Sequence, residues 1–138
     1  MSNTTSRIIQ FKKIGKPAEG YLSVGESFGE VPFDIKRVFW TYFTPDSITR
    51  GRHTHYETEM ILIALSGIVE VSTESITGEK QLFVLKNPNE GLYMPPLTWH
   101  EMSYSHTAVQ LVITNSLYDE NDYIRSYEEF KKLQSKQV

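Results

Sequence analysis

The sequence predicts an all-β protein, an antiparallel sandwich or barrel that ends in one short helix. Short runs of β-branched and aromatic residues recur at close intervals, and turn-forming Gly, Pro, Asn or Asp residues separate them. No long helical period interrupts these runs before the last twenty residues. With 138 residues the chain fits one domain, residues 1–138, which is long enough to bury a hydrophobic core.

Each expected strand is a short apolar or aromatic run between turn signals. Gly15–Gly20 separates the first two runs, and Asn87–Gly91 follows a run that carries Phe83 and Val84. The strands are centred on Ile8–Phe11, Tyr21–Val24, Lys36–Tyr42, His53–Tyr56, Glu59–Ser66, Ile68–Thr73, Lys80–Leu85, Gly91–Met94 with Thr98–Tyr104, and Ala108–Thr114.

The tail of the chain has a different pattern. Four apolar or aromatic residues recur at nearly helical spacing amid Asp, Glu and Lys: Tyr123, Ile124, Tyr127 and Phe130. Asp119 or Asn121 is expected to cap the start of this helix, because either side chain can accept hydrogen bonds from its first amides. Residues Ser135–Val138 are expected to fray.

Composition excludes several classes of function. A net charge of -3 and a pI of about 5.8 argue against binding to nucleic acid. The chain has no cysteine, which rules out disulfides and thiolate chemistry and favours the reducing cytoplasm. Residues Met1–Lys16 lack the apolar core of a secretion signal, and the longest apolar run, Met60–Leu65, is too short to cross a membrane.

The histidines carry the clearest chemical signal. Side chains alternate between the two faces of a strand, so His53 and His55 share one face. Two imidazoles on a buried face are costly unless their nitrogens find partners. With Glu59 and, on a later strand, His100, the pair predicts a functional site. His106 lies in a polar stretch and is expected to be a loop residue.

Two runs resemble the signatures of the cupin superfamily. Gly51–Glu59 contains H-x-H-x3-E after a glycine, and Gly91–His100 contains the glycine, proline and histidine of the second signature. The resemblance implies a cupin-type, jelly-roll-like antiparallel β-barrel. In metal cupins the equivalents of His53, His55, Glu59 and His100 bind one divalent ion. A metal-binding cupin, either a dioxygenase or a metal-assisted isomerase, is therefore one alternative.

A closer resemblance, over nearly the whole chain, is to the dTDP-4-keto-6-deoxyglucose 3,4-ketoisomerases. It implies an enzyme that needs no metal and no cofactor, takes a dTDP-linked 4-keto-6-deoxy sugar, and supplies sugars for bacterial surface polysaccharides such as the O-antigen of lipopolysaccharide. A homodimer is also implied. The matching segments are Pro32–Val38, Arg50–His55, Gly91–Tyr93, Trp99–Met102 and Tyr118–Arg125.

The resemblance assigns proton transfer to His53, with His55 beside it as proton partner or orienter, and the alternative is that the two histidines exchange these roles. A histidine suits this task because its ordinary pKa, about 6.5, lies near neutrality. His100 and Arg52 are candidate hydrogen-bond donors to the enolate oxygen that develops in the reaction.

Guanidinium groups match phosphate oxygens with paired donors, so Arg37, Arg50 and Arg125 are candidates for the diphosphate of the nucleotide. Tyr93 and Trp99 are candidates for stacking on the base or the sugar.

The chain departs from the family pattern at two places. Phe39 stands where relatives commonly carry a tyrosine, so Tyr93 or Tyr104 is expected to supply the missing hydroxyl, or the reaction differs. Residues 56–60 replace a pattern of basic residues and glutamine that is usual in the family. Two further alternatives are therefore an enzyme that acts on a different nucleotide sugar and a cupin that binds a nucleotide sugar without turnover. His100 resembles the galacto-forming members.

Overall fold

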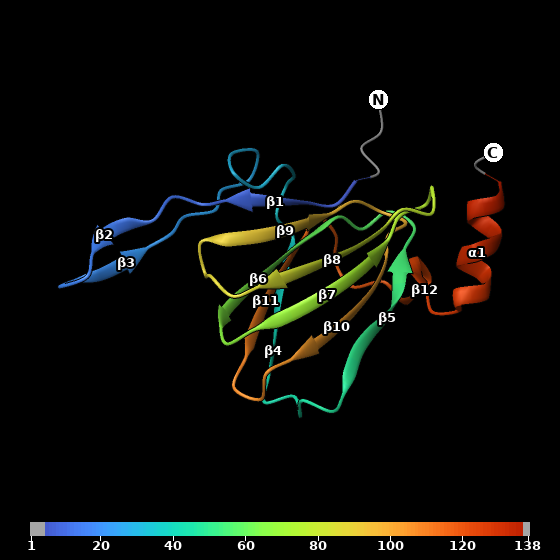
Figure 1. Ribbon diagram of the computed structural model, residues 1–138. Helices are drawn as coiled ribbons and strands as arrows, with labels where there is room; N and C mark the ends of the chain where they lie inside the picture. The colour runs from blue at the N-terminus through green and yellow to red at the C-terminus, as the bar shows by residue number, and fades with distance from the viewer. Residues whose placement is uncertain (1–4, 137–138) are drawn as a thin grey trace.

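Two five-stranded antiparallel sheets form the body of the protein in the computed structural model, which describes residues 5–136 (Figure 1). The first sheet has the order β1-β9-β6-β11-β4, and the second has the order β12-β5-β10-β7-β8. The strands are β1 (Arg7–Gln10), β2 (Ile14–Lys16), β3 (Gly20–Leu22), β4 (Arg37–Tyr42), β5 (Thr49–His55), β6 (Met60–Ser66), β7 (Val69–Glu74), β8 (Lys80–Leu85), β9 (Glu90–Met94), β10 (Trp99–Tyr104), β11 (Val109–Thr114) and β12 (Tyr123–Ile124).

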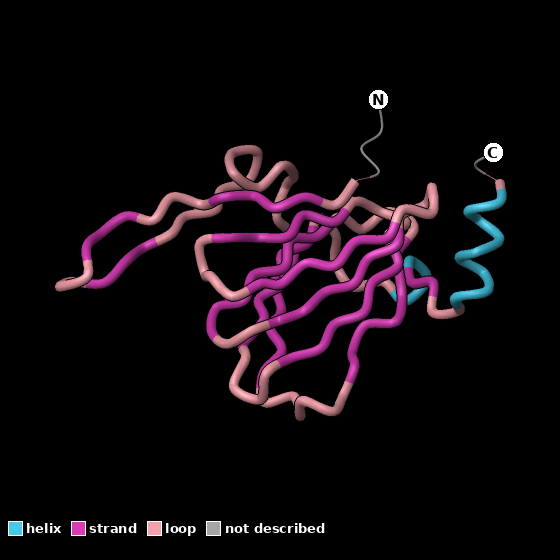
Figure 2. Tube along the Cα trace, in the orientation of Figure 1, coloured by secondary structure: helices cyan, strands magenta, loops and turns pink. Residues whose placement is uncertain are grey.

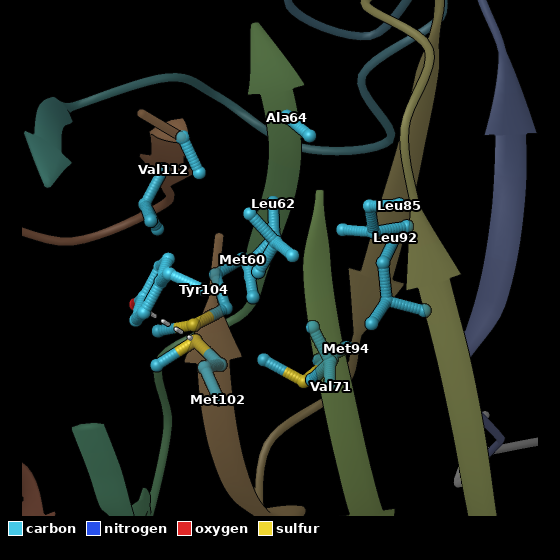
Figure 3. Packing of buried hydrophobic residues seen from close by; sticks show 12 residues of the cluster. Met60, Leu62, Ala64, Val71, Leu85, Leu92, Met94, Met102, Tyr104 and Val112 are labelled. Carbon is cyan, nitrogen blue, oxygen red and sulfur yellow. Dashed lines mark hydrogen bonds between the residues drawn. The ribbon is translucent and has the colours of Figure 1, made fainter. Parts of the chain in front are cut away.

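The main core lies between the two sheets. Alternation along β6 turns Met60, Leu62 and Ala64 inward, where they meet Val71 of β7 and Met102 of β10 (Figure 3). The first sheet buries part of its outer face as well. There Ile61 and Ile63 pack against a second cluster that includes residues of the N-terminal segment, namely Phe11, Val31 and Phe33. The all-β, cupin-type prediction is confirmed.

The hairpin of β2 and β3 projects away from the two sheets (Figures 1 and 2). Its side chains are largely open to solvent, with Ile14 and Tyr21 each 50% exposed and Leu22 60% exposed. An isolated two-stranded hairpin is marginally stable in water, so this element lacks the packing that supports the other strands.

The predicted strands are confirmed to within two residues at each end, with a few exceptions. β2 lies partly in the segment expected to be a turn, and β5 begins at Thr49, four residues before the prediction. Gly91–Met94 and Thr98–Tyr104 were expected as one combined stretch, but β9 belongs to the first sheet and β10 to the second. The intervening Pro95 has no amide hydrogen for a ladder and favours a break between them.

The predicted start of the helix is wrong. Tyr123 and Ile124 form β12, because their backbone pairs with His55 and Thr54 of β5. Asp119 does cap a helix, but a short 3₁₀ helix, Glu120–Asp122, in which it accepts a hydrogen bond from the amide of Asn121. The helix α1 runs from Tyr127 to Ser135 and is capped by Ser126, whose hydroxyl accepts from the amide of Glu129.

Helix α1 packs against the outer face of the second sheet. Phe130 is fully buried, with its ring centroid 5.9 Å from that of Trp99, and Ile124 and Ile76 complete the cluster. Of the residues expected to fray, Ser135 ends the helix and Lys136 caps it, and 137–138 lie outside the described residues. No helix within residues 5–136 is long and apolar enough to cross a membrane.

Replacing Phe130 with alanine should destabilise the protein by about 3–5 kcal/mol, because it removes a fully buried aromatic ring and leaves a cavity under α1. Urea unfolding followed by tryptophan fluorescence measures the loss. Lys132→Ala, on the exposed side of the same helix, is the matched control. Equal stability of the two variants would contradict this account of how α1 docks.

Candidate active site

The pairing of β5 with β10 brings three histidines together on the inner face of the second sheet. His53 lies directly opposite His100 in the ladder, and His55 follows two residues later on the same face. The ring centroid of His53 is 5.0 Å from that of His55 and 4.7 Å from that of His100, whereas the last two are 6.1 Å apart. His53 is therefore the central imidazole of the cluster.

These imidazoles line a cavity of about 220 Å³ between the two sheets. Its apolar wall comes from both sheets and consists of Phe39, Met60, Leu62, Met102 and Val112. Its polar lining includes Thr41, Arg50, Tyr104, Gln110, Tyr123 and Arg125 in addition to the histidines. The volume is below the roughly 300–1,000 Å³ of pockets for drug-sized ligands, so it suits a single small ring.

Backbone carbonyls define the tautomers of two rings. Nδ1 of His53 lies 3.1 Å from the carbonyl oxygen of Gly51, and Nδ1 of His100 lies 3.0 Å from that of Thr98. A carbonyl oxygen only accepts, so each Nδ1 carries a proton and donates it. In the neutral ring this leaves Nε2 of His53 and of His100 with a free lone pair.

All three histidines are held uncharged near neutral pH. Burial lowers the pKa of His55 to about 3, helped by the positive charges of Arg37 and Arg125. Burial also lowers the pKa of His100 to about 3. The pKa of His53 is lowered by burial and by Arg125, while its hydrogen bond to Gly51 acts in the opposite direction.

Nε2 of His55 is buried and has no hydrogen-bond partner among the described residues. A buried polar atom without a partner costs free energy, and active sites are where such costs are found. This nitrogen is a candidate ligand-binding atom of the cavity.

The segment around β12 forms one side of the cavity, a role the sequence analysis missed for Tyr123. The Tyr123 ring lies 4.3 Å from the His55 ring and 5.1 Å from the His53 ring, and the Arg125 guanidinium lies 4.4 Å from its centroid. Arg125 also donates two hydrogen bonds to Glu120, of 2.7 and 2.9 Å. The near-helical spacing of Tyr123 and Tyr127 concealed a strand residue, and only the pairing of β12 with β5 reveals it.

Of the two tyrosines expected to supply the hydroxyl that Phe39 lacks, Tyr104 lines the histidine cavity and Tyr93 does not. Phe39 lines the cavity, and strand alternation leaves Trp40 and Tyr42 exposed on the opposite face. Tyr104 lines the cavity and donates a 2.5 Å hydrogen bond to the buried Gln110. Burial raises the pKa of Tyr104 to about 12, so its hydroxyl stays protonated.

Two predicted stacking residues lie elsewhere. Tyr93 packs in the second core cluster on the outer face of the first sheet, where its hydroxyl donates to Glu59 at 2.5 Å. Trp99 is one residue before His100 and therefore points to the opposite face, under Tyr127 and Phe130 of α1. Neither side chain lines the histidine cavity, so neither ring stacks on a group bound inside it.

The arginines divide into two groups. Arg50 and Arg125 line the cavity. Arg37 does not line it but lies beside it, with its guanidinium 5.3 Å from the Phe39 ring and 5.7 Å from the Tyr118 ring. Arg52 is exposed and does not line the cavity, so its proposed contact with an enolate oxygen is not supported.

The four side chains expected to bind a metal in the alternative interpretation do not come together, because Glu59 lies apart from the three histidines. Glu59 uses its carboxylate to accept hydrogen bonds from Tyr93 and from Asn115, on the side away from the histidine cavity. Within residues 5–136, no group of three or more His, Asp or Glu side chains is arranged to hold a metal ion.

Low pH should destabilise the fold through His55 and His100. Their pKa values in the folded state, about 3, lie below the ordinary 6.5, so the unfolded chain takes up protons that the folded chain refuses. The contribution of these two histidines to the free energy of unfolding is complete above pH 6.5, and it is lost as the pH falls from 6.5 towards 3. Between pH 6 and 5 the free energy of unfolding should fall by about 1 kcal/mol per pH unit for each histidine.

Urea titrations at several pH values measure this slope, and His55→Asn should reduce it by about 1 kcal/mol per pH unit. His106→Asn is the control, since His106 is an exposed turn residue, as the sequence analysis expected. A His55→Asn slope equal to that of the unmodified protein would show that the buried imidazole is not kept neutral.

Comparisons with known proteins identify the family of this chain. The model of the family described as FdtA, WxcM-like, C-terminal, matches residues 4–135. The TDP-4-oxo-6-deoxy-alpha-D-glucose-3,4-oxoisomerase of Aneurinibacillus thermoaerophilus is 38% identical over 128 residues, which cover 92% of this chain and 91% of the relative.

Two solved structures extend the likeness to the fold. The sugar 3,4-ketoisomerase QdtA of Thermoanaerobacterium thermosaccharolyticum, solved in complex with TDP, matches with a TM-score of 0.91 at 36% identity and covers 96% of each chain. WlaRA, a TDP-fucose-3,4-ketoisomerase of Campylobacter jejuni, matches with a TM-score of 0.87 at 35% identity, over 94% of this chain and 95% of the other. The chain therefore belongs to the FdtA family, together with these 3,4-ketoisomerases of nucleotide-linked sugars.

Proposed function

We propose that this protein is a cofactor-independent sugar nucleotide 3,4-ketoisomerase, which converts a dTDP-linked 4-keto-6-deoxyhexose to the 3-keto isomer. One observation carries the proposal: three imidazoles held uncharged in one small cavity, with guanidinium groups of Arg50 and Arg125 at the same cavity. Neutral imidazoles can remove and return protons, and guanidinium groups can hold a diphosphate.

The reaction needs only proton transfer. The carbonyl at carbon 4 acidifies the proton on carbon 3, and a base removes it to leave an enediolate. A proton moves from the hydroxyl oxygen on carbon 3 to the oxygen on carbon 4. Delivery of a proton to carbon 4 then leaves the carbonyl at carbon 3, so the sugar gains and loses equal numbers of protons and no electrons leave it.

His53 is the residue we assign to this proton transfer. It is the central ring of the cluster, its Nδ1 is committed to Gly51, and its Nε2 is free to accept a proton. A lowered pKa keeps the ring neutral and ready to act as the base at neutral pH. His55, whose Nε2 has no protein partner among the described residues, acts beside it as proton partner or orienter.

His100 lies opposite His53, and its Nδ1–H is donated to Thr98, so the neutral ring presents Nε2 as an acceptor. It is therefore assigned to accept a hydrogen bond from a sugar hydroxyl, and the donor role predicted for it towards the enolate oxygen does not suit this tautomer. The protonated hydroxyl of Tyr104 lines the same cavity and takes the place of the hydroxyl that Phe39 lacks.

The diphosphate is assigned to Arg50 and Arg125, with Arg37 beside them. Arg125 is paired with Glu120, whose pKa its guanidinium lowers to about 2. An anionic diphosphate would compete with this carboxylate for the guanidinium donors. The relative QdtA is described with TDP bound, which supports a nucleotide diphosphate as the anchoring group.

Incubation with dTDP-4-keto-6-deoxyglucose in deuterated buffer tests the reaction. NMR should find a 3-keto product with deuterium at carbon 4. The configuration at carbon 4 tests whether the product is of the galacto type, as the resemblance at His100 implies. His53→Asn should slow exchange roughly 10²–10⁴-fold, because it removes the base. Binding of TDP should change little, since the diphosphate is assigned to the arginines and not to His53.

His106→Asn is the matched control and should keep full activity. A His53→Asn variant with undiminished turnover would exclude His53 as the base. Activity lost on exhaustive chelation and restored by a divalent ion would favour the metal cupin instead, and TDP binding with no exchange in the unmodified protein would favour the sugar-binding cupin.

We also propose a homodimer in which the N-terminal strands pack against a second copy. The projecting hairpin exposes Ile14, Tyr21 and Leu22, and Val38 and Trp40 of β4 are exposed on the outer face of the first sheet. Association would bury this apolar surface and support a hairpin that is marginal by itself.

Sedimentation equilibrium should give twice the mass of one chain, and Leu22→Asp should shift the protein towards monomer. Leu82→Asp, an equally drastic change at an exposed residue of β8, should leave the mass unchanged. A monomeric unmodified protein, or dissociation by both variants, would contradict the proposed interface.

The remaining expectations follow from the substrate. We propose that residues 1–138 act as a single cupin domain in the cytoplasm, and that the 3-keto sugar supplies the synthesis of bacterial surface polysaccharide such as O-antigen.

A further inference from the structure

The ladder between β5 and β10 contains one irregularity, and it lies beside the active-site histidines. Arg50 pairs with Met102 and Gly51 with Glu101, but the next pair is His53 with His100. Arg52 therefore has no opposite residue and is the extra residue of a β-bulge. Gly51 and Arg52 both have positive φ, 85° and 60°.

The bulge decides which way the histidines point. Residues opposite one another in an antiparallel pair share a face, and a shift of one residue moves every side chain to the other face. Without the extra residue, Arg52 would pair with His100, and His53 would pair with Trp99. His53 and His55 would then face α1, as Trp99 does, instead of the cavity.

The same bulge explains how Arg50 and His53 both reach the cavity. They are three residues apart, an odd spacing that regular alternation sends to opposite faces. One extra residue between them restores a common face.

Gly51 leaves no room for a side chain at this point. A Cβ atom on Gly51 would lie 2.9 Å from the carbonyl oxygen of His100 and 3.1 Å from Cε of Met102. The close approach of the two strands therefore requires glycine. The carbonyl of Gly51 is also the acceptor for Nδ1 of His53, so the bulge supplies the group that defines the tautomer of that ring.

We propose that the Gly51–Arg52 bulge is the positioning element of the active site, and that Arg52 acts through its left-handed backbone and not through its guanidinium. The inference rests on the proposed function for its effect on turnover. Arg52 is exposed and outside the cavity lining, so its side chain has no contact there that would explain a direct role.

A series of variants at Arg52 separates backbone from side chain, because all of them remove the guanidinium. Glycine and asparagine tolerate positive φ, alanine tolerates it less, and valine least. Turnover should follow this order, with Arg52→Gly and Arg52→Asn near the unmodified protein. Arg52→Val should be roughly 10²-fold slower, because a small misplacement of a catalytic group is enough for that loss.

The tautomer of His53 is a second measurement, and a general loss of stability would not change it. In the ligand-free protein, ¹⁵N NMR should show Nδ1 of His53 protonated in the glycine and asparagine variants. In the valine variant the Nε2-protonated form should increase, because a β-branched side chain disfavours the left-handed backbone more than the native arginine does. If the valine variant does not fold, Arg52→Thr, which is also β-branched, takes its place.

Equal turnover and an unchanged tautomer across the series would overturn the proposal. A uniform loss in all four variants would also overturn it and would assign the guanidinium to substrate binding. If the unmodified protein does not isomerise the sugar, the proposed function fails, and the tautomer series still tests the bulge by itself.

Discussion

The pairing of β5 with β10 is the constraint on which the rest of the site depends. It joins two segments more than forty residues apart and places His53 against His100 between two apolar sheets. Burial there does two things at once. It excludes water from the imidazoles, and it makes their charged forms costly, so that all three stay neutral while arginines lie within reach.

Three adjacent strands of the second sheet carry the histidines of the site and Tyr123. β10 carries His100, β5 carries the histidine pair, and β12 adds Tyr123 at the edge of the same sheet. The opposite sheet contributes an apolar wall with Phe39, which suits the methyl group and ring of a deoxy sugar. Helix α1 stays outside, where Phe130 and Trp99 hold the second sheet in place. The chemistry therefore uses the inner face of β10, and the docking of α1 uses its outer face.

Local patterns in the sequence were enough to predict most strands of the fold. Alternation and turn residues predicted the strands of the two sheets, and the H-x-H spacing predicted two imidazoles on one face. Tyr123 was misassigned to a helix because its spacing to Tyr127 and Phe130 is nearly helical. Backbone hydrogen bonds to β5, which a local pattern does not contain, override that spacing.

The sequence by itself determined the fold class, the absence of thiol chemistry and the identity of the reactive side chains. Tertiary structure decided which of them meet. It brought His53, His55, His100, Arg50 and Arg125 to one cavity, and it turned Tyr93, Trp99 and Arg52 away. The physical reason is that the face on which a side chain lies depends on the register between distant strands. A single bulged residue, Arg52, moves the side chains that follow it on β5 to the other face of the sheet.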